Sequence, residues 1–279
     1  MSLEVEPERS FGQALIVATR HGARSLDVFV DVEWSGAVAR RAEMFDPKPV
    51  VWSVLGSNVE PAKPAIMIGV DPPAVEPHVE ELLAMPEVRT IIEHGVVFGE
   101  CRGLEVARVS GTGTEQRLEV GVGVYDQGAF AVMHPDLTPQ QSLAEVVAQV
   151  LEHRRSDAAP HPINRLVRER WLRSELLDDP GRLGLTGLEP VEGAVARDGL
   201  HDRRAAFAHA PEEGVLVACS VGIDLDLIPA AAEVASREGA ERIVAVLPAR
   251  DDHPITRAVA DRCRIPVEIT VAQAPWPGG

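Results

Sequence analysis

Apolar and polar positions along the last quarter of the chain follow the order strand, helix, strand, helix, strand. Residues 215–220, 241–247 and 266–271 are short apolar runs, which are typical of buried strands. Residues 225–238 and 255–263 between them have helical spacing. Continuous apolar strands separated by helices favour parallel pairing. We therefore predict a Rossmann-like β-α-β-α-β unit at the C-terminus.

The earlier part of the chain shows the same kinds of pattern with less regularity. Alternation predicts a strand at 26–32, and helical spacing that begins with a capping box at Thr138 and Gln141 predicts a helix at 138–155. Two apolar runs around a glycine-rich connection at 110–116 predict a hairpin. The remaining expectations are helices at 8–21, 36–45, 76–93 and 164–177, strands at 50–55, 65–70, 96–98, 103–109 and 117–124, and an irregular connection at 180–214.

These elements together predict the class and the domain organisation of the chain. The fold class is α/β, with a mixed sheet and the C-terminal Rossmann-like unit. The expected organisation is an N-terminal α/β domain at 1–155, a helix with a long connection at 156–214, and the C-terminal unit at 215–279.

Net charge narrows the classes of partner. The chain has 27 basic and 43 acidic residues, a formal charge of −16. This balance counts against non-specific nucleic-acid binding and against anionic membranes, because both need clustered positive charge. Only Lys48 and Lys63 are lysines among the basic residues, a bias that we attribute to a GC-rich bacterial genome.

Cysteine usage and the N-terminus predict where the protein acts. Cys101, Cys219 and Cys263 are widely spaced, so we expect reduced thiols and neither a disulfide framework nor a metal site made of cysteines. The chain opens with acidic residues and has no apolar run of about 18 residues, which predicts a cytoplasmic protein without a membrane span. A homo-oligomer is an open alternative.

Small and polar residues follow two of the predicted C-terminal strands. Ser220, Gly222, Asp224 and Asp226 follow the first strand, and residues 250–253 follow the second. The carboxyl ends of neighbouring parallel strands lie at one edge of a sheet, where ligands bind. We therefore expect a site for a small anionic molecule at this edge.

Residue types suggest roles within that site. Ser220, Gly222 and Arg250 would position the ligand through a hydroxyl, a close backbone approach and a guanidinium. His253 would act as acid or base, because histidine titrates near neutrality. The cofactor is unknown, but Mg²⁺ or Mn²⁺ prefers carboxylate oxygens. The candidate ligands for such a metal are Asp224, Asp226, Asp251 and Asp252, of which Asp224 and Asp226 are also candidate catalytic residues.

A purely structural interpretation of the same residues is open. Asp224 is a good helix cap, and Asp252 or His253 is suited to cap the next helix after a solvated turn. The chain lacks a G-x-G-x-x-G fingerprint, a phosphate-binding loop with lysine and a G-x-S-x-G nucleophile elbow. The leading hypothesis is ligand binding with metal-assisted hydrolysis or transfer, and the alternative is a non-catalytic interaction or regulatory protein.

Acidic residues also mark the predicted strands of residues 76–155, at Glu100, Glu105, Glu119 and Asp126. This order of helix, hairpin and helix resembles the core of restriction-endonuclease-like nucleases, where two acids and a lysine bind a metal and activate water. The resemblance implies Glu105 and Glu119 as the two acids. Gly121 stands where that motif has lysine, so the resemblance implies a degenerate nuclease. The alternative is that these glutamates occupy the wet face of a hairpin.

The stretch 161–173 is the most basic part of the chain. Its arginines could bind a nucleic-acid backbone or an acidic partner beside Trp171. The other interpretation is a solvated helix face, in which the arginines pair with Glu169 and Glu175. The arginines expected to project from this helix are Arg165, Arg168 and Arg173.

Overall fold

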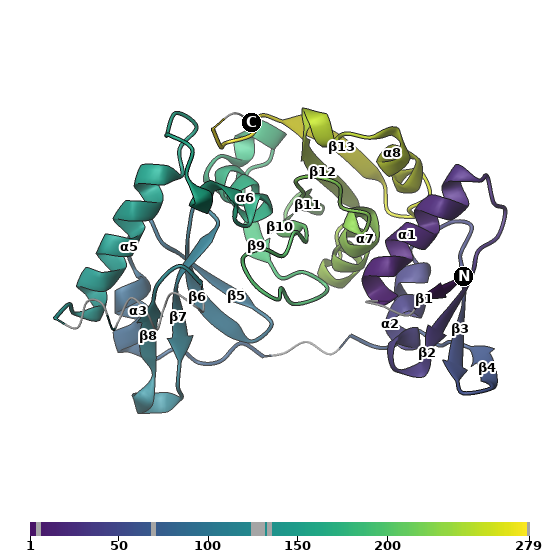
Figure 1. The fold of residues 1–279 in the computed structure, drawn as a ribbon, viewed down its shortest axis with the longest axis horizontal. Coiled ribbons are helices and arrows are strands. Elements are labelled where there is room, and N and C mark those ends of the chain that lie inside the picture. Colours follow the sequence, from purple (N-terminus) through teal and green to yellow (C-terminus); the bar gives the residue numbers. More distant parts are fainter. Residues whose placement is uncertain (4–6, 68–70, 124–131, 133–135, 278–279) are drawn as a thin grey trace. The chain divides into compact units, whose positions relative to one another are not determined.

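The computed structural model describes residues 1–3, 7–67, 71–123, 132 and 136–277 (Figure 1). Over this part of the chain it is a mixed α/β protein with seven α-helices and three β-sheets. The chain forms two compact units, each built from separate stretches of sequence. Unit 1 comprises Met1–Ile68, Leu185–Glu189 and Arg204–Ala272, and unit 2 comprises Gly69–Gly184, Pro190–Arg203 and Gln273–Gly279. The domain boundaries expected from the sequence, 1–155, 156–214 and 215–279, remain a prediction.

The first sheet of unit 1 has the strand order β1-β2-β3-β4, with β4 antiparallel and the other neighbours parallel. Its strands are β1 (Ser2–Leu3), β2 (Asp27–Asp31), β3 (Val50–Leu55) and β4 (Asn58–Pro61). Burial alternates along β2, as the sequence pattern predicts. The carboxylate of Asp31 accepts a hydrogen bond from the backbone N–H of Glu33 at 3.1 Å. This cap starts α2 (Val32–Ala42) earlier than the expected residue 36.

The second sheet of unit 1 contains the predicted C-terminal strands. Its order is β13-β12-β11-β10-β9. The strands are β9 (Glu189–Val191), β10 (Ala206–Ala210), β11 (Val215–Cys219), β12 (Arg242–Pro248) and β13 (Val267–Ala272), and the helices between the last three are α7 (Leu227–Glu238) and α8 (Pro254–Ala260). Strands β11, β12 and β13 pair in parallel, whereas β10 runs antiparallel to β11. The expectation of an irregular connection at 180–214 is wrong at β9 and β10, because pairing with neighbouring strands of the sheet organises these two short runs.

Two pairs of helices lie between the two sheets of unit 1. Helix α2 packs on β2 and β3, α7 packs on β11 and β12, and α8 packs on β13. Helix α1 (Pro7–Arg20) contacts α2, α7 and α8 (Figure 1). A Cβ atom on Gly12 of α1 would lie 2.0 Å from the backbone oxygen of Leu225. The backbone of α1 therefore packs directly against the backbone of the loop that precedes α7. The position of that loop therefore depends on α1.

Unit 2 contains an antiparallel sheet of order β5-β6-β7-β8, packed against α3 and α5. Its strands and helices are β5 (Arg89–Glu93), β6 (Val96–Cys101), β7 (Leu104–Ser110), β8 (Arg117–Val120), α3 (Pro77–Leu83), α5 (Pro139–His153) and α6 (Arg168–Asp178). The predicted β7–β8 hairpin is present, and so is the capping box of Thr138 and Gln141 at the start of α5. The core joins Val79 and Leu83 of α3 to Leu143 of α5 and the sheet.

Two expectations for this region are wrong. The helix expected at 76–93 ends at Leu83, and residues 89–93 form β5 because β6 supplies its backbone hydrogen-bond partners. The helix expected from residue 164 begins at Arg168, after a short 3₁₀ turn at Pro162–Arg165. Other 3₁₀ turns lie at Gly113–Glu115, Pro180–Leu183 and Ala249–Asp251.

Residues 65–67 of the strand expected at 65–70 have no regular structure, and 68–70 lie outside the described residues. Across the described ranges, every helix is too short or too polar to span a bilayer.

Candidate functional site

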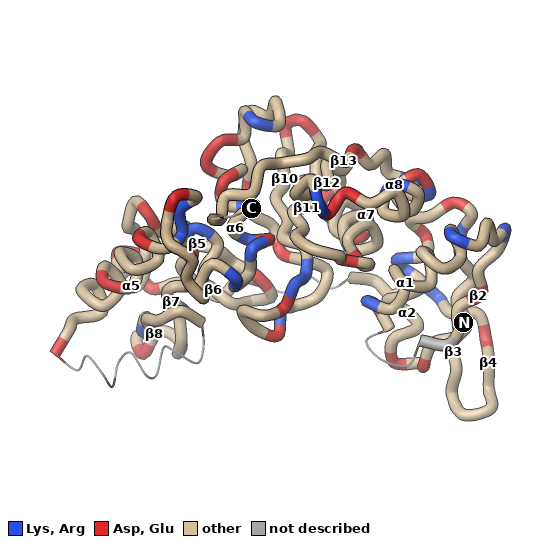
Figure 2. Tube along the Cα trace, turned by 45° about the horizontal axis from the view of Figure 1, so that its top comes forward, with Lys and Arg blue, Asp and Glu red and all other residues tan. Residues whose placement is uncertain are grey.

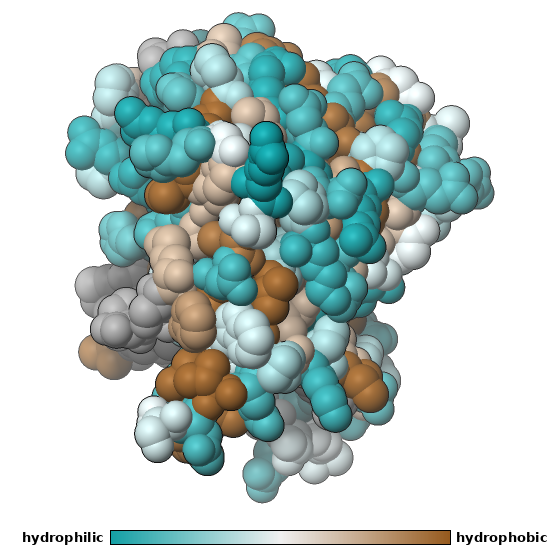
Figure 3. Space-filling view, turned by 90° about the vertical axis from the view of Figure 1, so that its right-hand side faces the viewer, coloured by the Kyte–Doolittle hydropathy of each residue, from teal (hydrophilic) through white to brown (hydrophobic). Residues whose placement is uncertain are grey.

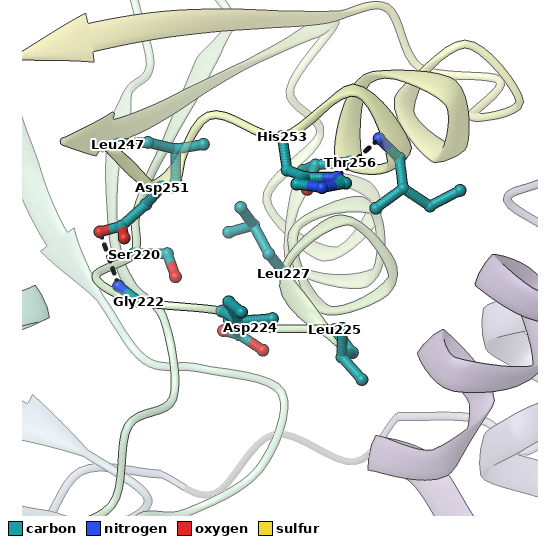
Figure 4. A pocket seen from close by; sticks show the side chains of 11 residues that line it. Ser220, Gly222, Asp224, Leu225, Leu227, Leu247, Asp251, His253 and Thr256 are labelled. Carbon is teal, nitrogen blue, oxygen red and sulfur yellow. Dashed lines mark hydrogen bonds between the residues drawn. The ribbon is translucent and has the colours of Figure 1, made fainter. Parts of the chain in front are cut away.

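A pocket of about 160 Å³ lies in unit 1 at the carboxyl ends of β11 and β12 (Figure 4). It is framed by the loop after β11, the end of β12 and the first turns of α7 and α8. Apolar side chains make up much of its wall: Ile223, Leu225, Leu227, Leu247 and Ile255. The other lining residues are Ser220, Gly222, Asp224, Asp251, His253 and Thr256. An apolar wall with a few polar groups is the usual composition of a small-molecule site.

Ser220 is the most buried polar residue of this pocket. It directly follows β11, and its backbone N–H donates to the carbonyl of Val246 at 3.1 Å. Its side chain is fully buried, and its Oγ has no hydrogen-bond partner among the described residues. Figure 4 shows the hydroxyl among the lining side chains. A buried polar atom without a partner costs about 1–3 kcal/mol of stability, and a ligand that bonds to it would recover that cost.

A single hydrogen bond joins the two loops at the mouth of the pocket. The backbone N–H of Gly222 donates to Oδ2 of Asp251 at 2.8 Å (Figure 4). Gly222 has φ +84°, a conformation that residues with a Cβ atom adopt only with strain. Arg250 lies beside this bond, with its Nε 3.8 Å from Oδ1 of Asp251. Its side chain is exposed and does not line the pocket.

His253 forms the start of α8. Its Nδ1 accepts a hydrogen bond from the backbone N–H of Ile255 at 3.2 Å, so the alternative interpretation of His253 as a helix cap is confirmed. With Nδ1 accepting, the neutral ring carries its proton on Nε2 and can donate from there. Asp252 lies outside the pocket and forms two hydrogen bonds with Arg257, at 2.9 and 2.6 Å, which lower the pKa of its carboxyl group.

A second hollow of about 480 Å³ shares the loop of Ile223, Asp224 and Leu225 with the pocket. Its other lining residues are Asp226 and, from α1, Arg9, Ser10 and Gln13. The Oδ1 atom of Asp224 accepts a hydrogen bond from the backbone N–H of Asp226 at 3.0 Å. Asp226 rather than Asp224 occupies the N-cap position of α7. The loop therefore forms a tight turn with polar groups on both sides.

Asp226 belongs to a buried ion cluster between α2 and α7. The Nη1 atom of Arg41 donates to both carboxylate oxygens of Asp226, at 2.9 and 3.0 Å. The Nε atoms of Arg41 and Arg40 donate to the two carboxylate oxygens of Glu233, at 2.5 and 2.8 Å. Burial raises the pKa of Asp226 to about 7, with Asp224 and Glu233 adding to the effect and Arg41 opposing it.

The four aspartates proposed as metal ligands have separate surroundings. Asp226 bonds to Arg41, Asp252 to Arg257 and Asp251 to the N–H of Gly222. In the part of the chain that the structure describes, no three His, Cys, Asp or Glu side chains are grouped so that they could hold a metal ion. The donor set therefore does not fit Mg²⁺ or Mn²⁺.

The acidic residues singled out in unit 2 each have partners of their own, although Glu100 and Glu105 lie opposite each other on β6 and β7. Glu105 bonds to Arg108 at 2.8 and 2.9 Å, and Glu119 to Ser110 and Arg117 at 2.8 and 3.0 Å. Glu100 is buried and accepts from Arg173 at 2.8 Å. Asp126 lies outside the described residues. Each described acid of this set is thus engaged by its own arginine or hydroxyl.

The arginines of residues 161–173 differ from one another. Arg165 is exposed, whereas Arg168 stacks over the ring of Trp276 at 5.0 Å. Arg173 is 1% exposed and bonds to Glu93 at 3.0 Å. The interpretation as a solvated helix face is therefore wrong for Arg173.

Sequence reasoning missed several residues of the pocket. Leu227, Leu247, Ile255 and Thr256 lie in predicted helices and strands, where an apolar or β-branched residue gives no indication of a site. Arg41 lies far from the loop in sequence, and only the packing of α2 on α7 brings it to Asp226. Comparison of the chain with protein-family models, with curated proteins and with solved structures gives no match.

Proposed function

We propose that unit 1 binds a small molecule that carries hydroxyl or amine donors, in the pocket at the ends of β11 and β12. The observation that carries this proposal is the Oγ of Ser220, fully buried in the wall of a pocket and without a partner in the described structure. Native proteins satisfy the great majority of such groups, so an unpaired one at a pocket favours a bound partner.

Electrostatics favour donors over an anionic group on this ligand. Asp224 and Asp251 line the pocket, and among the described residues no arginine or lysine lines it. Carboxylates in the wall of a pocket attract an ammonium or hydroxyl group and repel a phosphate. Arg250, one of the residues expected to position an anionic ligand, has an exposed side chain outside the lining. An anionic ligand thus becomes the second possibility, to be separated by experiment.

We propose binding rather than metal-assisted catalysis, because the aspartates face different partners and Nδ1 of His253 is used to start α8. A Rossmann-like character of the β11–β13 unit would agree with this placement, since ligands of such units bind at the carboxyl ends of parallel strands. A cytoplasmic location, a bacterial origin and self-association remain predictions from the sequence.

The test uses the methyl groups of the pocket as reporters. Methyl NMR spectra of the full chain, labelled at Ile and Leu, would be recorded with four probes: ethanolamine, ribose, inorganic phosphate and acetate. The methyls of Leu227, Leu247 and Ile255 line the pocket, and those of Leu143 in the core of unit 2 serve as an internal control. We expect ethanolamine or ribose to shift the pocket methyls and to leave Leu143 unchanged.

The matched variants are Ser220→Ala and Ser236→Ala, the latter an exposed serine on α7. Ser220→Ala should abolish the shifts, whereas Ser236→Ala should retain them. Shifts caused by phosphate or acetate alone would overturn the donor-bearing ligand and favour an anionic one. Shifts that persist in Ser220→Ala, or no shift with any probe, would overturn the proposal altogether.

A further inference from the structure

The first sheet of unit 1 has one covered and one open face. On β2, Val28 and Val30 are at most 1% exposed, whereas Phe29 between them is 37% exposed. The strand register places Phe29 opposite Trp52 and Asp31 opposite Val54, so these four residues share the face that α1 and α2 do not cover. We call this side of the sheet the outer face.

Apolar side chains run across three strands of the outer face. The rings of Phe29 and Trp52 are stacked, with centroids 6.2 Å apart and planes 14° from parallel. Pro61 lies opposite Trp52 on β4, and Val59 lies opposite Val54. Figure 3, which faces the side of unit 1 with these strands, shows hydrophobic residues grouped among hydrophilic ones. A continuous apolar face of this kind on a sheet is typical of an interaction surface.

Acidic side chains predominate on the strands of the outer face, and the one positive group recorded beside them in the described structure is the N-terminal ammonium of Met1, which donates to the backbone carbonyl of Asp27 at 2.8 Å. Strands β2, β3 and β4 contain Asp27, Asp31 and Glu60 and neither lysine nor arginine (Figure 2). Asp27 and Asp31 lie on the outer face, whereas Glu60, opposite Ser53, belongs to the other face of the sheet. Asp27 is tied to the aromatic pair, because Oδ1 of its carboxylate accepts from Nε1 of Trp52 at 2.9 Å. Oδ1 of Asp31 accepts from Glu33 N–H. Both carboxylates are thus held at the edge of the apolar strip.

This charge pattern selects among occupants. Nucleic acid and anionic lipid are repelled by acidic strands. A second copy of the chain would bring the same aspartates against each other, within a chain of net charge −16. A protein segment with basic and apolar residues is complementary to both features, since guanidinium groups stack on aromatic rings and pair with carboxylates.

We propose that the outer face docks a partner-protein segment in which apolar residues alternate with arginine or lysine. The apolar side chains of the segment would cover Val50, Val54 and Val59, and a basic side chain would lie over Phe29 and Trp52 beside Asp27. This surface is separate from the pocket at β11 and β12, so its occupant is independent of the small ligand proposed above.

The test measures binding of two fluorescent peptides, an alternating Leu-Arg repeat and an alternating Leu-Glu repeat of the same length, by fluorescence anisotropy at physiological salt. The full chain is compared with Phe29→Ser, with Asp27→Asn, which keeps the acceptor for Trp52, and with Val17→Ser. Val17 is an exposed apolar residue of α1 and provides the matched control. Unchanged thermal unfolding of each variant confirms that it folds.

We expect the basic peptide to bind, Phe29→Ser to weaken it by about tenfold or more, and Val17→Ser to leave it within about twofold. Asp27→Asn should weaken the basic peptide by a smaller factor. Equal binding of the two peptides, equal effects of Phe29→Ser and Val17→Ser, or no binding would overturn the proposal. A dimer in sedimentation velocity that Phe29→Ser dissociates would overturn it in favour of a second copy.

Discussion

The two units each bury a cluster of arginines and carboxylates, but the balance of charge differs between them. In unit 1, Arg40 and Arg41 face the acids Glu233 and Asp226, and the Nη1 of Arg41 also donates to the backbone carbonyl of Glu8. In unit 2, Arg170 and Arg173 face Glu93 and Glu100, and Arg154 lies buried nearby. When the side chain of Glu8 is included, acidic groups outnumber arginines in the cluster of unit 1. In the cluster of unit 2, arginines outnumber acidic groups.

The type of charge that is in excess determines which group has its pKa shifted by burial toward the neutral form. In unit 1, burial raises the pKa of Asp226 to about 7, and it also raises the pKa of Glu8. In unit 2, burial by itself raises the pKa of Glu93, but Arg170 and Arg173 outweigh it and bring the pKa down to about 2. Burial lowers the pKa of Arg154 to about 9, which leaves it protonated at neutral pH. Only the cluster of unit 1, next to the pocket, therefore titrates near neutrality.

The largest expected effect is in unit 2. Arg173→Met removes a partner from two buried carboxylates, Glu93 and Glu100, and should lower the free energy of unfolding by about 3–5 kcal/mol. Urea unfolding followed by ¹⁹F NMR of 5-fluorotryptophan reads this unit through Trp171 and Trp276. Arg182→Met, at an exposed pair with Asp179, is the control and should cost less than about 1 kcal/mol. A similar loss in both variants would contradict the importance of the buried cluster.

A smaller loss is expected from the equivalent change in unit 1. Arg41→Met should lower the free energy of unfolding by about 2 kcal/mol, because Asp226 can take up a proton and Glu233 keeps Arg40 as a partner. Trp34 and Trp52 report on unit 1 in the same ¹⁹F experiment. Arg242→Met, at an exposed pair with Glu268, is the matched control. A loss as large as that of Arg173→Met would show that the difference in charge balance has no energetic consequence.

The pH dependence should run in opposite directions in the two units. The raised pKa of Asp226 gives stability that is present at low pH and is lost as pH rises through about 7. Between about pH 6 and about pH 8 this amounts to about 1.4 kcal/mol for unit 1. Glu93 has a lowered pKa, so its contribution is present above its ordinary value near 4.5 and is lost as pH falls toward about 2.

Two variants separate these contributions. Asp226→Asn should remove the loss of stability of unit 1 near neutral pH, and Glu93→Gln should remove the loss of unit 2 in acid. The slopes of unfolding free energy against pH are compared with those of the wild type, each read from the tryptophans of its own unit. An unchanged slope in Asp226→Asn near pH 7 would be incompatible with a titrating Asp226.

The smallest expected effect is at the pocket. Ser220→Ala removes a buried hydroxyl that has no partner in the described residues, so it should leave the free energy of unfolding unchanged or raise it by about 1 kcal/mol. Ser236→Ala serves as the exposed control and should have no effect. If Ser220→Ala lowered the free energy of unfolding by more than about 1 kcal/mol, the hydroxyl would already be stabilising the folded protein and would not be an unpaired group that favours a bound ligand.

Local patterns were sufficient for the elements whose stability is mostly local. Thr138 and Gln141 identify the start of α5, and the glycine-rich connection identifies the β7–β8 hairpin. The predictions failed where pairing between distant segments decided the outcome. Ile91 and Ile92 have a helix-compatible spacing, yet they lie in β5 because β6 pairs with them. Strands β9 and β10 exist for the same reason.

The sequence by itself determined the β11–α7–β12–α8–β13 order, its parallel pairing and the polar residues at the strand ends, because apolar runs and turn residues are local features. It placed Ser220, Gly222, Asp224, Asp251 and His253 at what the structure shows to be one pocket. Only the tertiary structure decided that Asp226 bonds to Arg41, that Arg250 lies outside the pocket and that the Oγ of Ser220 has no partner among the described residues. Those outcomes depend on packing between segments far apart in the chain, which no local pattern records.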